Sequence, residues 1–189
     1  SLATVVERIE SAALPVFLFA FVILQGIFGA LTVTWQLQPI IVTAHLLGGM
    51  TTLALLGWLV LRPEVRTPAS PERGLWRWAL LGLGTLGLQL ALGGWVSSNY
   101  AAVACPDFPT CQNHWLPPMD MADAFVLWRG LGIDYTGGVL DHPARVAIHF
   151  VHRLGAIVTT IVLVAVAFVT FMRGGSARPA PKRGASAGP

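Results

Sequence analysis

Charged residues are scarce in this chain. Asp, Glu, Lys and Arg make up 11% of its 189 residues, whereas hydrophobic residues make up 54%. Because soluble domains usually carry about 25% charged residues, the composition excludes an ordinary soluble globule. The net charge is only +3, and the basic residues lie in loops and in the tail. A basic surface for nucleic acid is therefore absent from the pattern, and we expect no nucleic-acid partner.

Cysteine is nearly missing as well, since the chain has only Cys105 and Cys111. Both fall in a long stretch that is too polar to cross a membrane. Their spacing is wider than the C-x-x-C of dithiol oxidoreductases, and two prolines between them restrict the ring. The simplest interpretation is a disulfide that staples this segment. A redox-active dithiol and two unpaired thiols remain open as alternatives.

Long apolar runs, in contrast, are abundant. Because a membrane-spanning helix needs about 20 apolar residues, four stretches are long enough, at 14–35, 40–61, 75–97 and 145–172. The first lacks the basic start and the cleavage site of a signal peptide. We therefore predict an all-α, polytopic membrane protein whose four transmembrane helices form two hairpins in contact with membrane lipid.

These runs divide the chain into five parts. An amphipathic segment at 1–13, expected to end near Pro15, precedes the first hairpin at 14–62. A loop at 63–74 leads to the second hairpin at 75–172, which contains a long loop at 98–144. The tail at 173–189 is rich in Gly, Pro, Ala and Ser and is expected to be disordered.

The distribution of basic residues predicts the orientation. The short loop and the tail are rich in Arg and Lys, whereas the long loop carries five aspartates and only one arginine, Arg129. The positive-inside rule then places both termini in the cytoplasm and the long loop outside. For a bacterium this means a multi-pass protein of the inner membrane with its cysteines in the periplasm, where disulfides persist.

The two hairpins repeat each other. The pattern L-Q-x-x-x-G-[AG] begins at Leu24 and again at Leu88, and the pattern H-x-L-G-[GA] begins at His45 and again at His152. Small residues in these motifs allow helices to approach closely. The same small residues would also leave room for a flat cofactor between helices, so packing and cofactor binding are compatible interpretations.

His45 and His152 are the strongest candidates for a function. Each falls early in the returning helix of its hairpin, and an ionisable residue inside a membrane span indicates a functional site. Neutral imidazole is a suitable axial ligand for haem iron. The alternative for either residue is a histidine satisfied by a neighbouring carbonyl. His114 and His142 fall in the long loop and are expected to be ordinary surface groups.

His149 and Arg153 flank the second candidate. His149 precedes His152 by three residues, which places both on one side of a helix. It could be a second-shell or proton-handling group, or a polar residue without a role. Arg153 is a cation at the membrane edge that would suit a haem propionate, and snorkelling to the interface is an equal alternative.

The motifs resemble those of one family. The stretches LQGIFGALTVTWQLQPIIVTAHLLGG (24–49), LQLALGGWVSSNYAAVACPDFPTCQNHW (88–115) and AIHFVHRLGA (147–156) are similar to the haem A synthases, in the form found in proteobacteria. These membrane oxidoreductases convert a methyl group of haem O to the formyl group of haem A for cytochrome c oxidase assembly. The resemblance covers roughly residues 14–172.

The resemblance implies a site and partners. Family members are usually built from eight transmembrane helices in two halves, and this chain would correspond to the central four. His45 would then hold the substrate haem O, and His152 would hold a haem b that carries electrons. Phe108, Trp95 and Trp115 could pack against the tetrapyrrole or anchor at the interface. The farnesyltransferase that produces haem O is a candidate partner, and no catalytic residue is assigned.

Several alternatives stay open at this stage. The chain is expected to be a fragment of a full enzyme, a truncated gene product, or a half-size unit that forms a homo-oligomer. A simple b-type cytochrome, with His45 and His152 on one haem, would transfer electrons without changing its ligand. A thiol–disulfide exchanger using Cys105 and Cys111 and an inactive fragment are the remaining interpretations.

Overall fold

The computed structural model of the chain describes residues 2–61 and 73–174. Within these ranges the chain is helical and forms no β-strand, so the predicted all-α class is confirmed. The predicted loop at 63–74 and the tail at 173–189 fall almost wholly outside the described residues, as do the side chains of the segment at 1–12.

Four of the five helices are long and apolar. They are α1 (Leu2–Thr34), α2 (Pro39–Leu61), α3 (Arg73–Ser98) and α5 (His142–Gly174), and a single short turn, α4 (Met121–Ala124), interrupts the long loop. The stretches able to cross a membrane are Ala13–Thr34, Pro39–Leu61, Gly74–Ser98 and His142–Arg173. These agree with the four predicted spans to within three residues. His142, which we expected in the loop, is instead the first residue of α5.

One boundary was predicted wrongly. The first helix does not end near Pro15, because α1 continues without a break from Leu2 to Thr34. Proline removes only one backbone donor from a helix. In an apolar medium the remaining backbone groups have no better partner than the helix itself, so the apolar stretch after Pro15 keeps the helical backbone.

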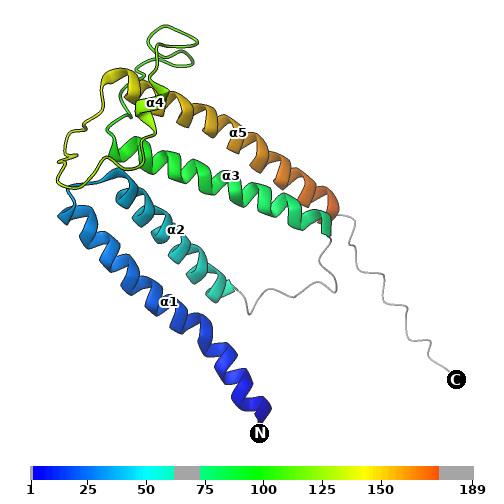
Figure 1. The fold of residues 1–189 in the computed structure, drawn as a ribbon. Helices are drawn as coiled ribbons and strands as arrows, with labels where there is room; N and C mark the ends of the chain where they lie inside the picture. Colours follow the sequence, from blue (N-terminus) through cyan, green and yellow to red (C-terminus); the bar gives the residue numbers. More distant parts are fainter. Residues whose placement is uncertain (1, 62–72, 175–189) are drawn as a thin grey trace, which may run out of the picture.

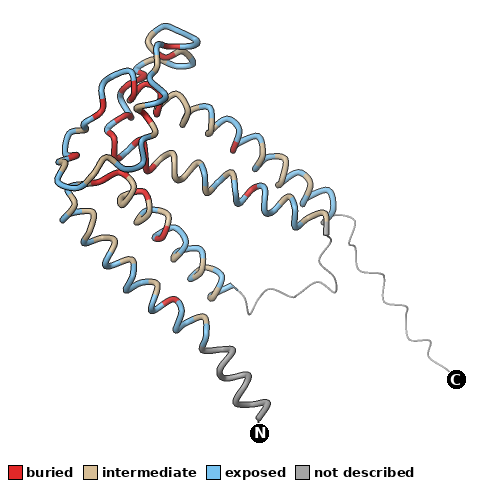
Figure 2. Tube along the Cα trace, viewed as in Figure 1, coloured by how far each residue is buried: buried red, intermediate tan, exposed pale blue. Residues whose placement is uncertain are grey.

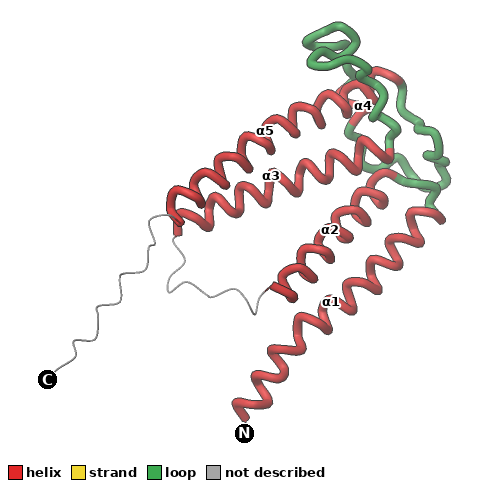
Figure 3. Tube along the Cα trace, turned by 180° about the vertical axis from the view of Figure 1, so that it is seen from behind, coloured by secondary structure: helices red, strands yellow, loops and turns green. Residues whose placement is uncertain are grey.

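The long helices lie side by side in a row. Helix α1 packs on α2, α2 on α3, and α3 on α5, whereas α1 and α5 at the two ends of the row make no contact with each other. Figures 1 and 3 show this arrangement from opposite sides. Of each membrane-spanning window only 6% to 22% of the residues are buried. Most apolar side chains of the row therefore face lipid or other protein.

The buried core lies at one end of the row, where Thr34, Pro39, Ser98 and His142 stand; we call it the loop end. Residues 99–141 fold over it and, with α4, close a cluster of buried side chains that includes Trp95, Ala101 and Ile148. Figure 2 shows buried residues concentrated there. The indole nitrogen of Trp95 donates to the carbonyl of Ala124 at 2.9 Å. This bond fastens the loop to α3.

Close packing between the hairpins depends on Gly94. A Cβ atom at this position would lie 3.3 Å from the Thr43 Cα atom and 3.1 Å from the Leu46 side chain of α2. Gly84, on the same helix, has no heavy atom within 4 Å of the equivalent point. The two glycines therefore differ in what a side chain would meet, although both lie inside α3.

We predict that Gly94→Leu destabilises the chain by about 1–3 kcal/mol, because overpacking would push α2 away from α3. Thermal unfolding in detergent, followed by circular dichroism, measures the effect. Gly84→Leu is the matched control, since it gains the same helix propensity without a clash. Equal midpoints for the two variants would show that the α2–α3 contact does not contribute to stability.

Candidate functional site

Each candidate histidine packs against a glycine of its own hairpin. A Cβ atom on Gly29 of α1 would lie 3.3 Å from His45 Cε1, and one on Gly93 of α3 would lie 3.4 Å from His152 Cε1. Both glycines stand four residues after the glutamine of the repeated motif. The imidazoles therefore occupy space that a side chain at either glycine would restrict.

The glutamines make the reverse contact. The amide of Gln25 lies over Gly48, and the amide of Gln89 lies over Gly155, so closely that a Cβ atom on either glycine would overlap it. Each of these glycines follows its histidine by three residues. The sequence repeat is thus a structural repeat, in which a glutamine crosses to one helix while a histidine crosses back.

In the second hairpin the crossing is closed by hydrogen bonds. Gln89 Nε2 donates to His152 Nδ1 at 3.0 Å and to the His152 carbonyl oxygen at 3.1 Å. The Gln89 Oε1 atom is buried without a hydrogen-bond partner. An open groove of about 270 Å³ borders Gln89 and is lined mostly by apolar side chains of α3 and α5, but His152 is not part of its lining.

In the first hairpin the same parts are present without the bond. His45 Nδ1 and Gln25 Oε1 are both buried, and neither has a hydrogen-bond partner. A buried polar atom without a partner is uncommon in native proteins. If the imidazole carries its proton on Nδ1, one of these atoms is a donor and the other an acceptor, and both lack a partner.

The structure does not bring the two candidate ligands together. His45 faces α1 and His152 faces α3, and α3 lies between α2 and α5 in the row. Each imidazole therefore belongs to its own hairpin. This arrangement suits two separate sites better than a single haem held by both histidines.

Arg153 holds the loop that the two cysteines define. Its Nη1 atom donates to the carbonyl oxygens of Asp107 at 2.6 Å and Thr110 at 3.0 Å, and its Nη2 atom donates to that of Cys105 at 2.7 Å. The guanidinium also lies 5.8 Å from the ring centroid of Phe108. The cation predicted to meet a propionate is thus mainly occupied with the loop.

His149 faces the same loop. Its Nδ1 atom accepts from the Cys105 N–H at 3.3 Å, and its Nε2 atom receives Arg153 Nε at 3.2 Å. A neutral imidazole has only one nitrogen that accepts, so these two bonds compete. His149 therefore binds to the loop, one turn nearer to the loop end than His152.

Cys105 and Cys111 form a disulfide, which confirms the preferred interpretation. Their exposed fractions are 3% and 1%. Thiol–disulfide exchange needs direct attack on a sulfur atom, so the burial disfavours a role in exchange. Asp107 stabilises the ring from within, because its Oδ1 accepts from the Gln112 N–H at 2.5 Å and its Oδ2 accepts from the Asn113 N–H at 3.0 Å.

The remaining predicted residues lie apart from the imidazoles. Trp95 is buried beneath the loop, whereas Phe108 and Trp115 are largely exposed. His114 and His142 are exposed at the loop end. Within the described residues no three His, Cys, Asp or Glu side chains are grouped so that they could hold a metal ion.

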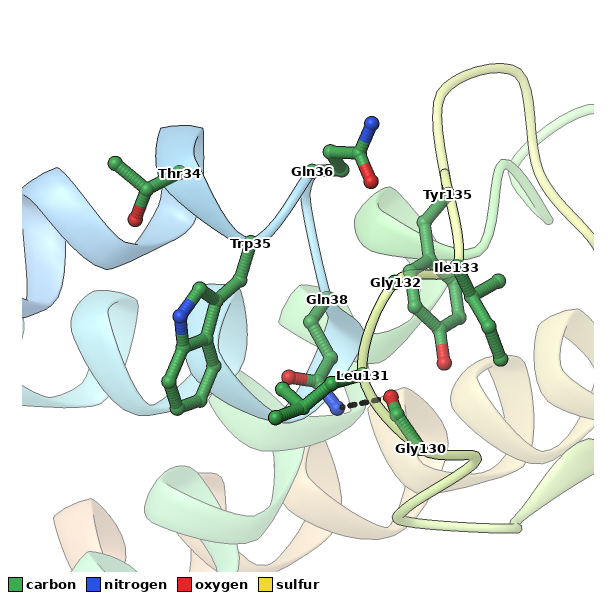
Figure 4. Close-up of a pocket in the computed structure, with 9 residues that line it drawn as sticks. All are labelled: Thr34, Trp35, Gln36, Gln38, Gly130, Leu131, Gly132, Ile133 and Tyr135. Carbon is green, nitrogen blue, oxygen red and sulfur yellow. Dashed lines mark hydrogen bonds between the residues drawn. The ribbon is translucent and has the colours of Figure 1, made fainter.

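A small pocket lies at the loop end, between the α1–α2 turn and residues 130–135 of the long loop. It has a volume of about 160 Å³ and is lined by residues 34–36, Gln38, residues 130–133 and Tyr135. Gln38 Nε2 donates to the Gly130 carbonyl at 3.4 Å (Figure 4), and the Tyr135 N–H donates to the Gln36 carbonyl at 3.1 Å. These contacts fasten the loop to the α1–α2 turn, and the pocket contains no predicted site residue.

Sequence reasoning missed Gln25 and Gln89. The signal was in the motif, because both glutamines recur at the same place in the repeat, but the pattern alone assigns them no partner. Their contacts with Gly48 and Gly155 across the hairpin identify them as part of the site.

Comparison with known proteins gives consistent matches. A family model described as COX15-CtaA, cytochrome oxidase assembly protein, matches residues 2–187. The chain is 41% identical over 162 residues to the heme A synthase of Shewanella oneidensis, covering 84% of this chain and 49% of that protein. It is 27% identical over 188 residues to the heme A synthase of Granulibacter bethesdensis, covering 93% and 46%. The chain thus spans about half the length of these relatives. No solved structure matches.

We predict that Arg153→Lys disorders the disulfide loop while leaving the helices intact, because lysine keeps the charge but lacks the planar fork that contacts three carbonyls. Amide exchange at Cys111, Gln112 and Asn113 should become at least about tenfold faster. Arg129→Lys is the control, since Arg129 bonds to Asp123 in another part of the loop. Unchanged exchange in Arg153→Lys would show that the disulfide alone orders the ring.

We also predict that the ring loses order in acid. The hydroxyl of Thr110, followed by the backbone N–H groups of Asn113 and Gln112, lowers the pKa of Asp107 below 3.8, although desolvation acts in the opposite sense. Stability from this carboxylate is therefore present above pH 3.8 and is lost as the pH falls through the lowered pKa. Carbon-13 NMR of the Asp107 carboxyl group, recorded as a function of pH, measures this pKa. Thr110→Val should raise the pKa, and a wild-type pKa at or above 3.8 would contradict the prediction.

Proposed function

The chain belongs to the COX15-CtaA family of cytochrome oxidase assembly proteins, and on that basis we propose that it forms part of a membrane oxidoreductase that converts a methyl group of haem O to the formyl group of haem A. The observation that carries the proposal is the paired site. Two hairpins each place one imidazole against a glycine of the partner helix, and in each hairpin a glutamine packs on the glycine that follows the histidine by three residues.

The residues fit a tetrapyrrole with an axial imidazole. Histidine is among the usual ligands of haem iron, and His45 and His152 are available in separate hairpins. The adjacent glycines make room for each imidazole between the helices, and the groove next to Gln89 is lined mostly by apolar side chains, which suits a macrocycle. The buried Nδ1 of His45 lacks a partner, which is a feature of a site whose hydrogen bonding is incomplete without a ligand.

The two histidines have different roles in this proposal. His45 would hold the substrate haem O, and His152 would hold a haem b that would supply electron transfer. The protein positions both groups and tunes them through the atoms around each imidazole. Arg153 uses four of its N–H donors on the loop and on His149, which leaves one on Nη2 for a haem propionate.

The loop over the site has a protective role. The Cys105–Cys111 disulfide and Arg153 fix the chain segment that covers the loop end. A fixed cover excludes water from the site, and exclusion of water limits side reactions of a bound intermediate. His149 accepts a hydrogen bond from the Cys105 N–H of this loop, so its role in the proposal is to position the cover.

The setting follows from the helices and the family. The protein is a multi-pass bacterial membrane protein. We further infer that both termini are cytoplasmic and that the disulfide loop is periplasmic, since the long loop is poor in Arg and Lys. Haem O would arrive from the farnesyltransferase that makes it. A second copy of the chain, or the rest of a longer polypeptide, would complete the two sites.

We predict that the two histidines support different haems. Protein purified from membranes in mild detergent should give a low-spin haem spectrum that is lost in His152→Ala, whereas bound haem O or haem A should depend on His45. Reduced-minus-oxidised spectra with extraction and typing of the haem measure both. His114→Ala, in the exposed loop, is the matched control. One haem lost equally in both variants would instead indicate a simple b-type cytochrome.

A further inference from the structure

We propose that Gln25 and Gln89 are positioning residues, and that each amide oxygen holds an imidazole in the tautomer whose Nε2 can bind iron. The inference rests on the proposed function, because it concerns the ligands of the haem sites. It adds a role for two residues that neither bind iron nor contact the reacting atoms.

The requirement comes from the chemistry of imidazole. A neutral ring has one protonated and one unprotonated nitrogen. If Nε2 binds iron, Nδ1 must carry the proton, and a metal-bound histidine almost always donates that proton to an acceptor nearby. The acceptor fixes the orientation of the ring and increases its electron donation to the metal. A histidine in an apolar span has few acceptors to choose from.

Each hairpin contains a buried amide oxygen that is available as this acceptor. Within the described residues, Gln89 is the side chain that bonds to His152 Nδ1, and Gly93 stands against Cε1. Nε2 is therefore the ring nitrogen not engaged by the amide. The Oε1 atoms of Gln25 and Gln89 are both buried without a donor. The Nδ1–H group of a ligating imidazole is a donor of the right kind for each of them.

The amide of Gln89 must turn to make this bond. Its Nε2 atom now donates to His152 Nδ1, which places the ring proton on the other nitrogen. The two ends of an amide have nearly the same shape, so a half-turn about the Cγ–Cδ bond brings Oε1 to Nδ1 without moving a helix. The turn exchanges the bond to the His152 carbonyl for one that satisfies Oε1.

The first hairpin holds the same parts in a different state. The Gln25 amide nitrogen, rather than its oxygen, lies nearest to Gly48, whereas in the second hairpin Gln89 Oε1 lies nearest to Gly155. His45 Nδ1 and Gln25 Oε1 are unpaired. In both hairpins, therefore, the amide oxygen is free to accept the proton that a ligating imidazole carries on Nδ1.

The test is the midpoint potential of the haem that depends on His152, in protein purified from membranes and supplied with haemin b. Gln89→Glu places a stronger acceptor at Nδ1, so the potential should fall, because a more electron-rich ligand favours ferric iron. Gln89→Leu removes the acceptor, so the potential should rise and haem affinity should fall by roughly 10–100-fold. A residue that only fills space would not shift the potential in opposite directions.

Two controls make the result specific to the pair. Thr160→Val, two turns along α5 from His152 and outside the groove, removes an exposed hydroxyl that bonds to the Ala156 carbonyl of its own helix and should leave the potential unchanged. Gln25→Leu should weaken only the haem that depends on His45. If Gln89→Leu does not yield folded protein, a fall in potential in Gln89→Glu alone supports the proposal.

The outcomes separate this inference from the proposed function. A haem that still depends on His152 but keeps its potential in both Gln89 variants, or shifts in one direction in both, overturns the role of the glutamine and leaves the function standing. Wild-type protein in which no haem depends on His45 or His152 overturns the proposed function and the positioning role together.

Discussion

The close approach of the two helices in each hairpin determines where the imidazoles lie. Gly48 and Gly155 lack the Cβ atom that would displace a glutamine, and Gly29 and Gly93 lack the one that would press on a histidine. In each hairpin the glutamine therefore needs the glycine on the histidine helix, and the histidine needs the glycine on the glutamine helix. These contacts explain why the Gln-Gly and His-Gly motifs occur in both hairpins. Apolar packing alone would not require them, since many arrangements of small residues allow helices to approach closely.

A second constraint ties the histidine helix to the loop that covers it. Arg153 follows His152 directly, so the guanidinium that binds the Cys105 and Thr110 carbonyls is anchored next to the candidate ligand. Carbonyl oxygens cannot lose their acceptor character with pH, and arginine stays charged. The attachment is therefore permanent under physiological conditions, and a displacement of the loop would be transmitted to the helix turn that carries the imidazole.

The sequence predicted the helices, the disulfide and the family, because long apolar runs, a lone cysteine pair and a repeated motif are local signals. It did not predict what Arg153 binds, since its partners lie 43 to 48 residues away in a loop without periodicity. Nor did it predict the roles of the glutamines, which depend on contacts between helices. The sequence also predicted a helix end near Pro15 that the structure does not have. The rule that proline ends a helix comes from soluble proteins and neglects how an apolar medium enforces backbone hydrogen bonding.

The supply of axial ligands limits what these helices can do by themselves. Low-spin haem iron takes an axial ligand on each face, and each hairpin contributes one imidazole. Among the other described histidines, His149 faces Cys105 and Arg153, and His114 and His142 are exposed at the loop end. In the proposed function, a second ligand for each haem would come from outside the four-helix row, whose faces are largely exposed. That is the geometry expected of one layer of a larger assembly, in which a second set of helices completes both sites at once.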